Sequence, residues 1–204
     1  MKIAIIDYGM GNIHSVAKAI EICGVKPLIT SKRNEISSAD KILLPGVGAF
    51  DDAMQELNKL GLVSLILEQV SSKKPFLGIC LGMQLLLESS QEAKINKGLG
   101  ILGGQVVKFS AGQDLKVPHM GWNDFKVVSK DCLLLSGITG NGQVYFCHSY
   151  YPEPSDKSVI AATSNYGLEF GCVLWKDNVY GVQFHPEKSQ AVGLKIIKNF
   201  VELC

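Results

Sequence analysis

The chain has 204 residues, 47% of them hydrophobic and 19% charged, and a formal net charge of +1. This composition is typical of one globular domain, expected over residues 1–204, and it excludes a disordered chain. The balanced charge argues against a nucleic-acid-binding protein, and no run of about 18 apolar residues suggests a membrane span. Six cysteines without C-x-x-C spacing and a first strand too short for a secretion signal predict free thiols in the cytoplasm.

The first half of the chain alternates strand patterns with helix patterns. Each expected helix carries apolar residues at helical spacing, and Gly24 and Gly61 stand where helices should end. Alternation of this kind implies a parallel sheet with helices on both faces. The expected strands are 2–7, 26–30, 41–45 and 75–80, and the expected helices are 12–24, 49–61, 62–72 and 81–90.

The second half has short strand patterns separated by Gly, Pro, Asn and Asp, which predict antiparallel strands and hairpins. A last amphipathic segment, 190–204, predicts a helix packed on the sheet. The fold class expected is therefore α/β, with a central, mostly parallel sheet flanked by helices and antiparallel strand additions in the second half. The short strands are expected at 105–109, 124–128, 144–147, 159–165, 170–178 and 179–184.

Cys80 lies where an apolar strand runs directly into an apolar helix. Gly78 and Gly82 flank it two residues away on either side, which is the spacing of a nucleophile elbow with cysteine in place of serine. The start of the following helix favours the thiolate through its dipole, and its free N–H groups, that of Leu81 first, can hold an oxyanion. The alternative is that Cys80 is a small buried hydrophobic residue, as free cysteines often are, but a packed cysteine does not require such a turn.

A thiol nucleophile needs a base, and His185 is the strongest candidate among the four histidines. It ends a strand pattern and is followed by Pro186 and Glu187. In extended chain, residues two apart point to the same side, so Glu187 can bond one ring nitrogen and leave the other for the thiol. Of the other histidines, His148 is a candidate for lining a pocket.

The GLGILG run, 98–103, matches a dinucleotide-binding pattern by letters alone. The pattern requires a strand before it and a helix after it, whereas here a polar stretch precedes and a strand pattern follows. The run is therefore expected to be a turn.

Taken together, several motifs resemble those of the triad (class I) glutamine amidotransferases, and more narrowly the glutaminase subunits of imidazole glycerol phosphate synthases. The similarity extends over essentially the whole chain. The motifs are DYGMGN (7–12), LPGVGAF (44–50), GICLGMQ (78–84), PHMGWN (118–123) and VQFHPEKS (182–189).

The resemblance implies hydrolysis of glutamine to glutamate and ammonia by Cys80, His185 and Glu187, through a cysteine thioester, without a metal or organic cofactor. It implies that the ammonia passes to a (β/α)₈-barrel cyclase in a heterodimer, which forms imidazole glycerol phosphate and AICAR in histidine biosynthesis. Relatives of this subunit feed other amidotransfers, such as amidation of a surface sugar, so the acceptor stays open.

The same resemblance implies roles for further residues. The second oxyanion donor would be the N–H of Val47 or Gly48, in a strand thought to turn inward only when the partner is loaded. The expected glutamine-binding residues are Gly46, Gln84, Ser149 and Tyr150, and the expected interface residues are Asn12, Trp122 and Lys188.

Two other functions compete with this reading. One is a cysteine peptidase or esterase built on the same elbow, which Gln84 disfavours. The other is a non-enzymatic subunit that only regulates its partner, which predicts that no thioester forms on Cys80.

Overall fold

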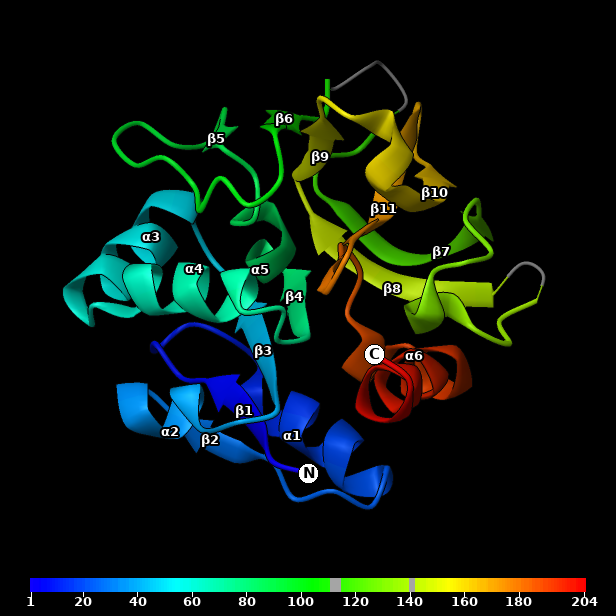
Figure 1. The fold of residues 1–204 in the computed structure, drawn as a ribbon. Coiled ribbons are helices and arrows are strands. Elements are labelled where there is room, and N and C mark those ends of the chain that lie inside the picture. Colours follow the sequence, from blue (N-terminus) through cyan, green and yellow to red (C-terminus); the bar gives the residue numbers. More distant parts are fainter. Residues whose placement is uncertain (111–114, 140–141) are drawn as a thin grey trace.

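The computed structural model describes residues 1–110, 115–139 and 142–204. Its main element is a nine-stranded sheet, in the order β2-β1-β3-β4-β12-β11-β10-β7-β8, with a separate three-stranded sheet, β5-β6-β9, beside it (Figure 1). No helix within the described ranges has the length and apolar character needed to cross a membrane.

The nine-stranded sheet is parallel in one half and antiparallel in the other. From β2 to β12 every neighbouring pair is parallel, and from β12 to β8 every pair is antiparallel. This confirms the expected class, with the antiparallel strands all contributed by the second half of the chain. The strands of this sheet are β1 (Ile3–Ile6), β2 (Leu28–Thr30), β3 (Lys41–Gly46), β4 (Phe76–Cys80), β7 (His119–Val127), β8 (Gly142–His148), β10 (Ile160–Asn165), β11 (Glu169–Lys176) and β12 (Val179–Val182).

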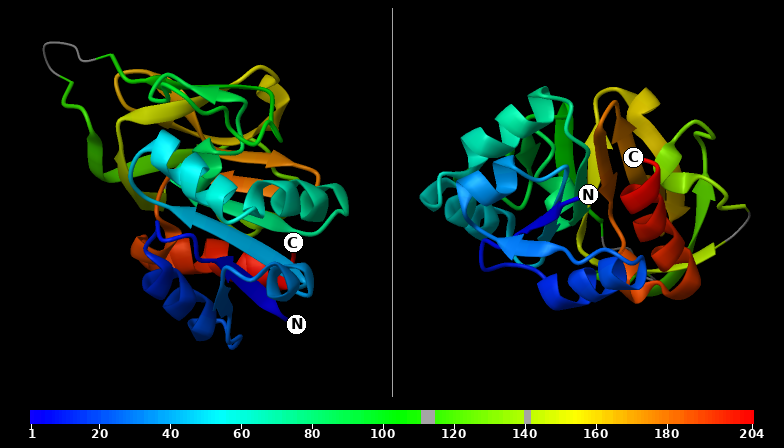
Figure 2. Two further views of the ribbon diagram at one scale, coloured as in Figure 1. Left: turned by 90° about the vertical axis from the view of Figure 1, so that its left-hand side faces the viewer. Right: turned by 60° about the horizontal axis from the view of Figure 1, so that its bottom comes forward.

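Helices cover both faces of the parallel half, because successive strand residues point to opposite sides. Ile5 and Leu43 pack on the face of α1 and α6, whereas Ile6 and Leu44 pack on the face of α2, α3 and α4. The helices α1 and α6 lie side by side in every view (Figure 2). The helices are α1 (Ile13–Ile22), α2 (Arg33–Ser37), α3 (Phe50–Lys59), α4 (Leu62–Ser71), α5 (Leu81–Gln84) and α6 (Gln190–Glu202), with short 3₁₀ turns at η1 (Leu133–Leu135), η2 (Lys157–Val159) and η3 (Pro186–Lys188).

The helix expected over 81–90 is wrong beyond its first turn. α5 ends at Gln84, although the leucine run that follows has high helix propensity. The carbonyl oxygens of Leu85 and Leu87 instead accept hydrogen bonds from the N–H groups of Leu99 and Gly100, at 2.8 and 3.2 Å. A distant segment thus takes the acceptors that would continue the helix. The same segment contains the GLGILG run, which forms no helix: residues 98–100 are irregular, 101–103 bend, and a strand begins at Gly104.

The sequence patterns missed α2 and two strands of the smaller sheet. In β9 (Tyr150–Pro154), two prolines hide the strand, and the strand lies at a sheet edge, where proline is tolerated. The other two strands of this sheet are β5 (Ser89–Ser90) and β6 (Gly104–Lys108).

Three neighbouring parallel strands, β3, β4 and β12, have their carboxyl ends together at one end of the large sheet. Gly46 at the end of β3 is paired with Cys80 at the end of β4, and Val182 at the end of β12 is paired with Ile79. The chain leaving β12 therefore passes Cys80 within three residues and carries His185 to the same edge. Ligand sites of open α/β sheets lie at this carboxyl edge.

Candidate functional site

Cys80 occupies a strained turn between β4 and α5. Its backbone angles are φ 54° and ψ −111°, a conformation that non-glycine residues seldom adopt and that costs free energy. The side chain is 6% exposed. Cys80 also lines the pocket described below. Backbone strain at a residue that lines a pocket indicates that the fold holds the sulfur in place for a purpose other than packing.

The flanking glycines are required by contacts with backbone atoms. A side-chain carbon added at Gly78 would lie 2.6 Å from the carbonyl oxygen of Gly82, and one added at Gly82 would collide with the carbonyl oxygen of Leu44. The strand–turn–helix geometry predicted from the glycine spacing is therefore present in the structure.

His185 and Glu187 form the pair predicted from the HPE motif. Nδ1 of His185 lies 2.9 Å from Oε1 of Glu187, whose side chain is fully buried. The predicted extended conformation is wrong, because residues 186–188 form the 3₁₀ turn η3, yet this turn still brings the carboxylate onto the ring. With Nδ1 occupied by Glu187, Nε2 is the ring nitrogen left to serve the Cys80 thiol.

Opposing effects act on the imidazole of His185. Burial by itself lowers the pKa of His185, but its hydrogen bonds to Cys80 and Glu187, together with the charges of those two residues, raise the pKa to about 10. At neutral pH the ring is then an imidazolium, and it stands beside the sulfur that acts as nucleophile in a cysteine–histidine pair. Because α5 is a single turn, the helix dipole expected at Cys80 is small.

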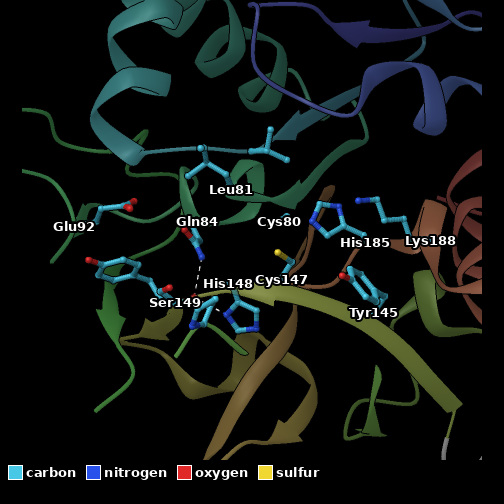
Figure 3. Close-up of a pocket in the computed structure, with 14 residues that line it drawn as sticks. Cys80, Leu81, Gln84, Glu92, Tyr145, Cys147, His148, Ser149, His185 and Lys188 are labelled. Carbon is cyan, nitrogen blue, oxygen red and sulfur yellow. Dashed lines mark hydrogen bonds between the residues drawn. The ribbon is translucent and has the colours of Figure 1, made fainter. Parts of the chain in front are cut away.

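A cavity of about 350 Å³ opens at this edge of the sheet, a size typical of small-molecule sites. In Figure 3, His185 and Lys188 lie on one side of the pocket and Glu92 on the other. The lining also includes the predicted residues Val47, Gly48, Cys80, Leu81, Gln84, Ser149 and Tyr150.

The side chain of Gln84 is held by two acceptors in this pocket. Its Nε2 donates to the carbonyl oxygen of Tyr150 at 2.9 Å (Figure 3). The same Nε2 donates to Oε1 of Gln183 at 3.1 Å. Nε2 of Gln183 in turn lies 3.9 Å from the sulfur of Cys80. These bonds fix the Gln84 amide so that its oxygen remains available to a ligand.

Two buried histidines continue this network, and one of them, His148, lines the pocket (Figure 3). Nδ1 of His148 donates to the carbonyl oxygen of Tyr150 at 2.8 Å, so its Nε2 accepts from Nδ1 of His119 at 3.1 Å. Nε2 of His119 then accepts from the amide of Asn123 at 3.2 Å. Burial lowers the pKa of His119 to about 4 and that of His148 to about 3. Both rings are neutral at pH 7, which leaves His185 as the only histidine of this group able to carry a proton at the thiol.

Four further predicted site residues have the following surroundings in the structure. Gly46 is not among the described residues that line the cavity, although its neighbours Val47 and Gly48 are. Nδ2 of Asn12 donates to Oε1 of Glu187 at 3.4 Å, so this residue supports the carboxylate. Lys188 lines the pocket and lies 5.7 Å from the centre of the Tyr145 ring. Trp122 is 45% exposed and packs edge-on against the same Tyr145 ring.

The sequence patterns do not indicate several residues of this site, among them Cys147, Glu92 and Gln183. Cys147, one of the six predicted free thiols, lines the pocket together with Cys80. Glu92 brings a carboxylate to the lining, and its Oε2 also accepts from the N–H of Phe50 at 2.9 Å. Gln183 precedes the predicted His185 in the VQFHPE motif, and its buried side chain links Gln84 to Cys80. Only the alternation of VQF, which places Gln183 and His185 on one side, could have indicated a role for Gln183.

Residues 4–204 match the family model described as glutamine amidotransferase class-I. The imidazole glycerol phosphate synthase subunit HisH of Geobacter sulfurreducens is 50% identical over 207 residues, covering 99% of this chain and 99% of that protein. The imidazole glycerol phosphate synthase subunit HisH 1 of Methanococcus maripaludis is 52% identical over 204 residues, covering 98% of this chain and 99% of that protein.

Solved structures with much lower identity share the fold. PurLQS from Thermotoga maritima superposes with a TM-score of 0.77 at 18% identity, covering 98% of this chain and 97% of that one. The glutaminase domain of Trypanosoma brucei CTPS, with bound acivicin, gives a TM-score of 0.71 at 16% identity, covering 99% of this chain and 94% of that one.

Proposed function

Because this chain belongs to the class-I glutamine amidotransferase family, we propose that it is the glutaminase subunit of an imidazole glycerol phosphate synthase in histidine biosynthesis. It hydrolyses glutamine to glutamate and ammonia and delivers the ammonia to a cyclase subunit. The relatives that carry this name match at about half identity over nearly their full length. The observation that carries the chemistry is the juxtaposition of the strained Cys80 with the His185–Glu187 pair.

In the first half of the reaction, the Cys80 thiolate attacks the side-chain amide carbon of glutamine. The oxyanion that forms is held by the N–H of Leu81 and by that of Val47 or Gly48. The imidazolium of His185 gives its proton to the leaving nitrogen, the C–N bond breaks, and ammonia departs from a glutamyl thioester.

In the second half, His185 is neutral and takes a proton from water as that water attacks the thioester carbon. The C–S bond then breaks, glutamate leaves, and the thiolate–imidazolium pair is restored. Glu187 holds the ring in the orientation needed for both steps through its bond to Nδ1.

Groups in the pocket match the rest of a glutamine molecule. Its α-ammonium requires an anion, and Glu92 places a carboxylate in the lining. The free amide oxygen of Gln84 and the segment of Ser149 and Tyr150 are placed to bind the remaining polar groups. This assignment predicts that Glu92→Gln weakens the binding of glutamine rather than the chemical step.

A partner subunit is expected on physical grounds, because ammonia released into neutral water is mostly protonated and is no longer a nucleophile. Val47, in the lining of the pocket, is 41% exposed. Trp122, which packs against the lining residue Tyr145, is 45% exposed, and Met120, paired with the lining residue Cys147, is 60% exposed. We propose that a (β/α)₈-barrel cyclase covers this surface, with Asn12, Trp122 and Lys188 near the contact, so that ammonia passes directly between the subunits.

Two experiments test the proposal. In the assembled complex, Cys80→Ala and His185→Ala should abolish ammonia release from glutamine, and wild-type turnover in either variant would refute the assignment. Identification of the protein that copurifies with the chain tests the acceptor, because a barrel cyclase supports the histidine pathway and a sugar amidotransferase contradicts it.

A further inference from the structure

The hydroxyl of Tyr8 is a buried polar group that the proposed chemistry does not use. Tyr8 is 2% exposed, and no residue in the described parts of the chain forms a hydrogen bond with its hydroxyl. Burial, and the charge of nearby Cys80, raise the pKa of Tyr8, so the phenol keeps its proton at neutral pH. A buried O–H donor without an acceptor is costly and therefore requires an explanation.

This hydroxyl lies against the end of β3. A side-chain carbon added at Gly46 would lie 2.6 Å from the hydroxyl oxygen of Tyr8 and 2.9 Å from the amide nitrogen of Gly82. Val47, the next residue, lines the pocket, whereas Tyr8 is not among the described lining residues. The hydroxyl therefore lies against Gly46 and outside the described lining of the pocket.

The geometry of a trans peptide connects this hydroxyl to the oxyanion site. The N–H of Val47 and the carbonyl of Gly46 belong to the same peptide and point in opposite directions. When the Val47 N–H faces the pocket, the Gly46 carbonyl faces the interior, where a polar group needs a partner. The Tyr8 hydroxyl, which lies against Gly46, is a buried donor without a partner in the described parts of the chain.

We propose that Tyr8 is a positioning residue, whose hydroxyl donates to the Gly46 carbonyl when the Val47 N–H turns toward the pocket to hold the oxyanion. The hydroxyl lacks this bond in the present structure, and under this proposal the strand seen here is therefore in the resting arrangement. Glycine at positions 46 and 48 makes rotation of the intervening peptides sterically easy. The Tyr8 bond then lowers the free energy of the active arrangement relative to the resting one. This inference rests on the proposed function.

The test is Tyr8→Phe, which removes only the hydroxyl. Ammonia release is measured in the isolated chain and in the complex with the cyclase and imidazole glycerol phosphate. The ratio of the rate in the complex to the rate in the isolated chain should fall about tenfold, the effect expected for a buried carbonyl left unpaired. This loss should be in kcat, while KM for glutamine changes less than about twofold. The thermal midpoint of the isolated variant should equal or exceed that of the wild type, because an unpaired buried group has been removed.

Tyr180→Phe is the matched control. Tyr180 is also a buried tyrosine, but its hydroxyl interacts with Cys204 near the C-terminus, so its removal should leave the ratio of rates unchanged. A Tyr8→Phe complex with the wild-type ratio would overturn the inference, and so would a variant that unfolds more easily than wild type. If the wild-type complex itself releases no ammonia, the proposed function fails; if only the Tyr8→Phe effect is missing, that function stands.

Discussion

Gly78→Ala tests whether the turn at Cys80 depends on close contact between β4 and α5. The added carbon would lie 2.6 Å from the carbonyl oxygen of Gly82, 2.7 Å from its carbonyl carbon and 2.8 Å from the amide nitrogen of Met83. All three are backbone atoms, so no side chain can rotate away, and real side-chain carbons essentially never approach closer than 3.0 Å. The start of α5 must therefore move back by several tenths of an ångström.

The movement has a cost in both stability and activity. Overpacking of this kind costs about 1–3 kcal/mol, of which a gain of about 0.4–1 kcal/mol from a less flexible unfolded chain offsets a part. We therefore expect the free energy of unfolding to fall by about 1–2 kcal/mol. Displacement of Cys80 and of the Leu81 N–H should reduce kcat/KM for glutamine by about tenfold or more, since a misplacement of 1 Å costs about 100-fold.

Urea denaturation gives the stability, and ammonia release in the complex gives the activity. Gly103→Ala is the matched control, because the nearest atoms to the added carbon are 3.9 Å away, so its stability should change by less than about 0.5 kcal/mol. Wild-type stability and activity in Gly78→Ala would refute the close packing of the elbow.

Three further changes have defined outcomes. Below pH 6.5 the unfolded chain protonates His119 and His148, while the folded chain keeps them neutral down to about pH 4 and 3. As the pH is lowered, the free energy of unfolding should therefore decrease by up to about 1.4 kcal/mol per pH unit for each ring. Measured by denaturation between pH 6.5 and 5, this dependence of the free energy of unfolding on pH should be weaker in His119→Gln, and an unchanged dependence would contradict the neutral pair. Lys41→Met should lower the free energy of unfolding by about 2 kcal/mol without affecting glutamine turnover, because the buried Lys41 ammonium donates to two carbonyl oxygens in the last turn of α6 and to an oxygen of Cys204; unchanged urea denaturation would contradict this. Glu187→Gln should reduce kcat by at least about 100-fold. It should also lower the pKa of His185, because the carboxylate raises that pKa; the pH dependence of kcat/KM measures this pKa, and a variant with the wild-type pH profile would contradict the role of Glu187.

The local patterns of the sequence predicted the features that depend on neighbouring residues. Strand–helix alternation predicted the sheet class, the glycines around Cys80 predicted the sharp turn, and the HPE motif predicted the bond between His185 and Glu187. In each case the physical cause acts over a few residues, so a short window of sequence contains the information.

Features that depend on distant contacts could not be predicted in this way. The helix expected after Gln84 stops because the 98–102 segment takes its carbonyl oxygens, and nothing within 81–90 indicates this. The pairing of His119 with His148 depends on the register of β7 and β8, which places the two residues opposite each other. Cys147 on β8 and Cys80 at the end of β4 meet only in the lining of the pocket, and no local pattern around either cysteine indicates this.

The most direct test of the account is to map the covalent intermediate. Six free cysteines are present, and two of them, Cys80 and Cys147, line the pocket, so the site of acylation distinguishes the nucleophile. The complex is mixed with glutamine, quenched in acid and digested, and the peptides are analysed by mass spectrometry. We expect a glutamyl thioester on the peptide that contains Cys80 and on no other; an adduct on Cys147, or glutamine turnover that continues in Cys80→Ala, would contradict the account.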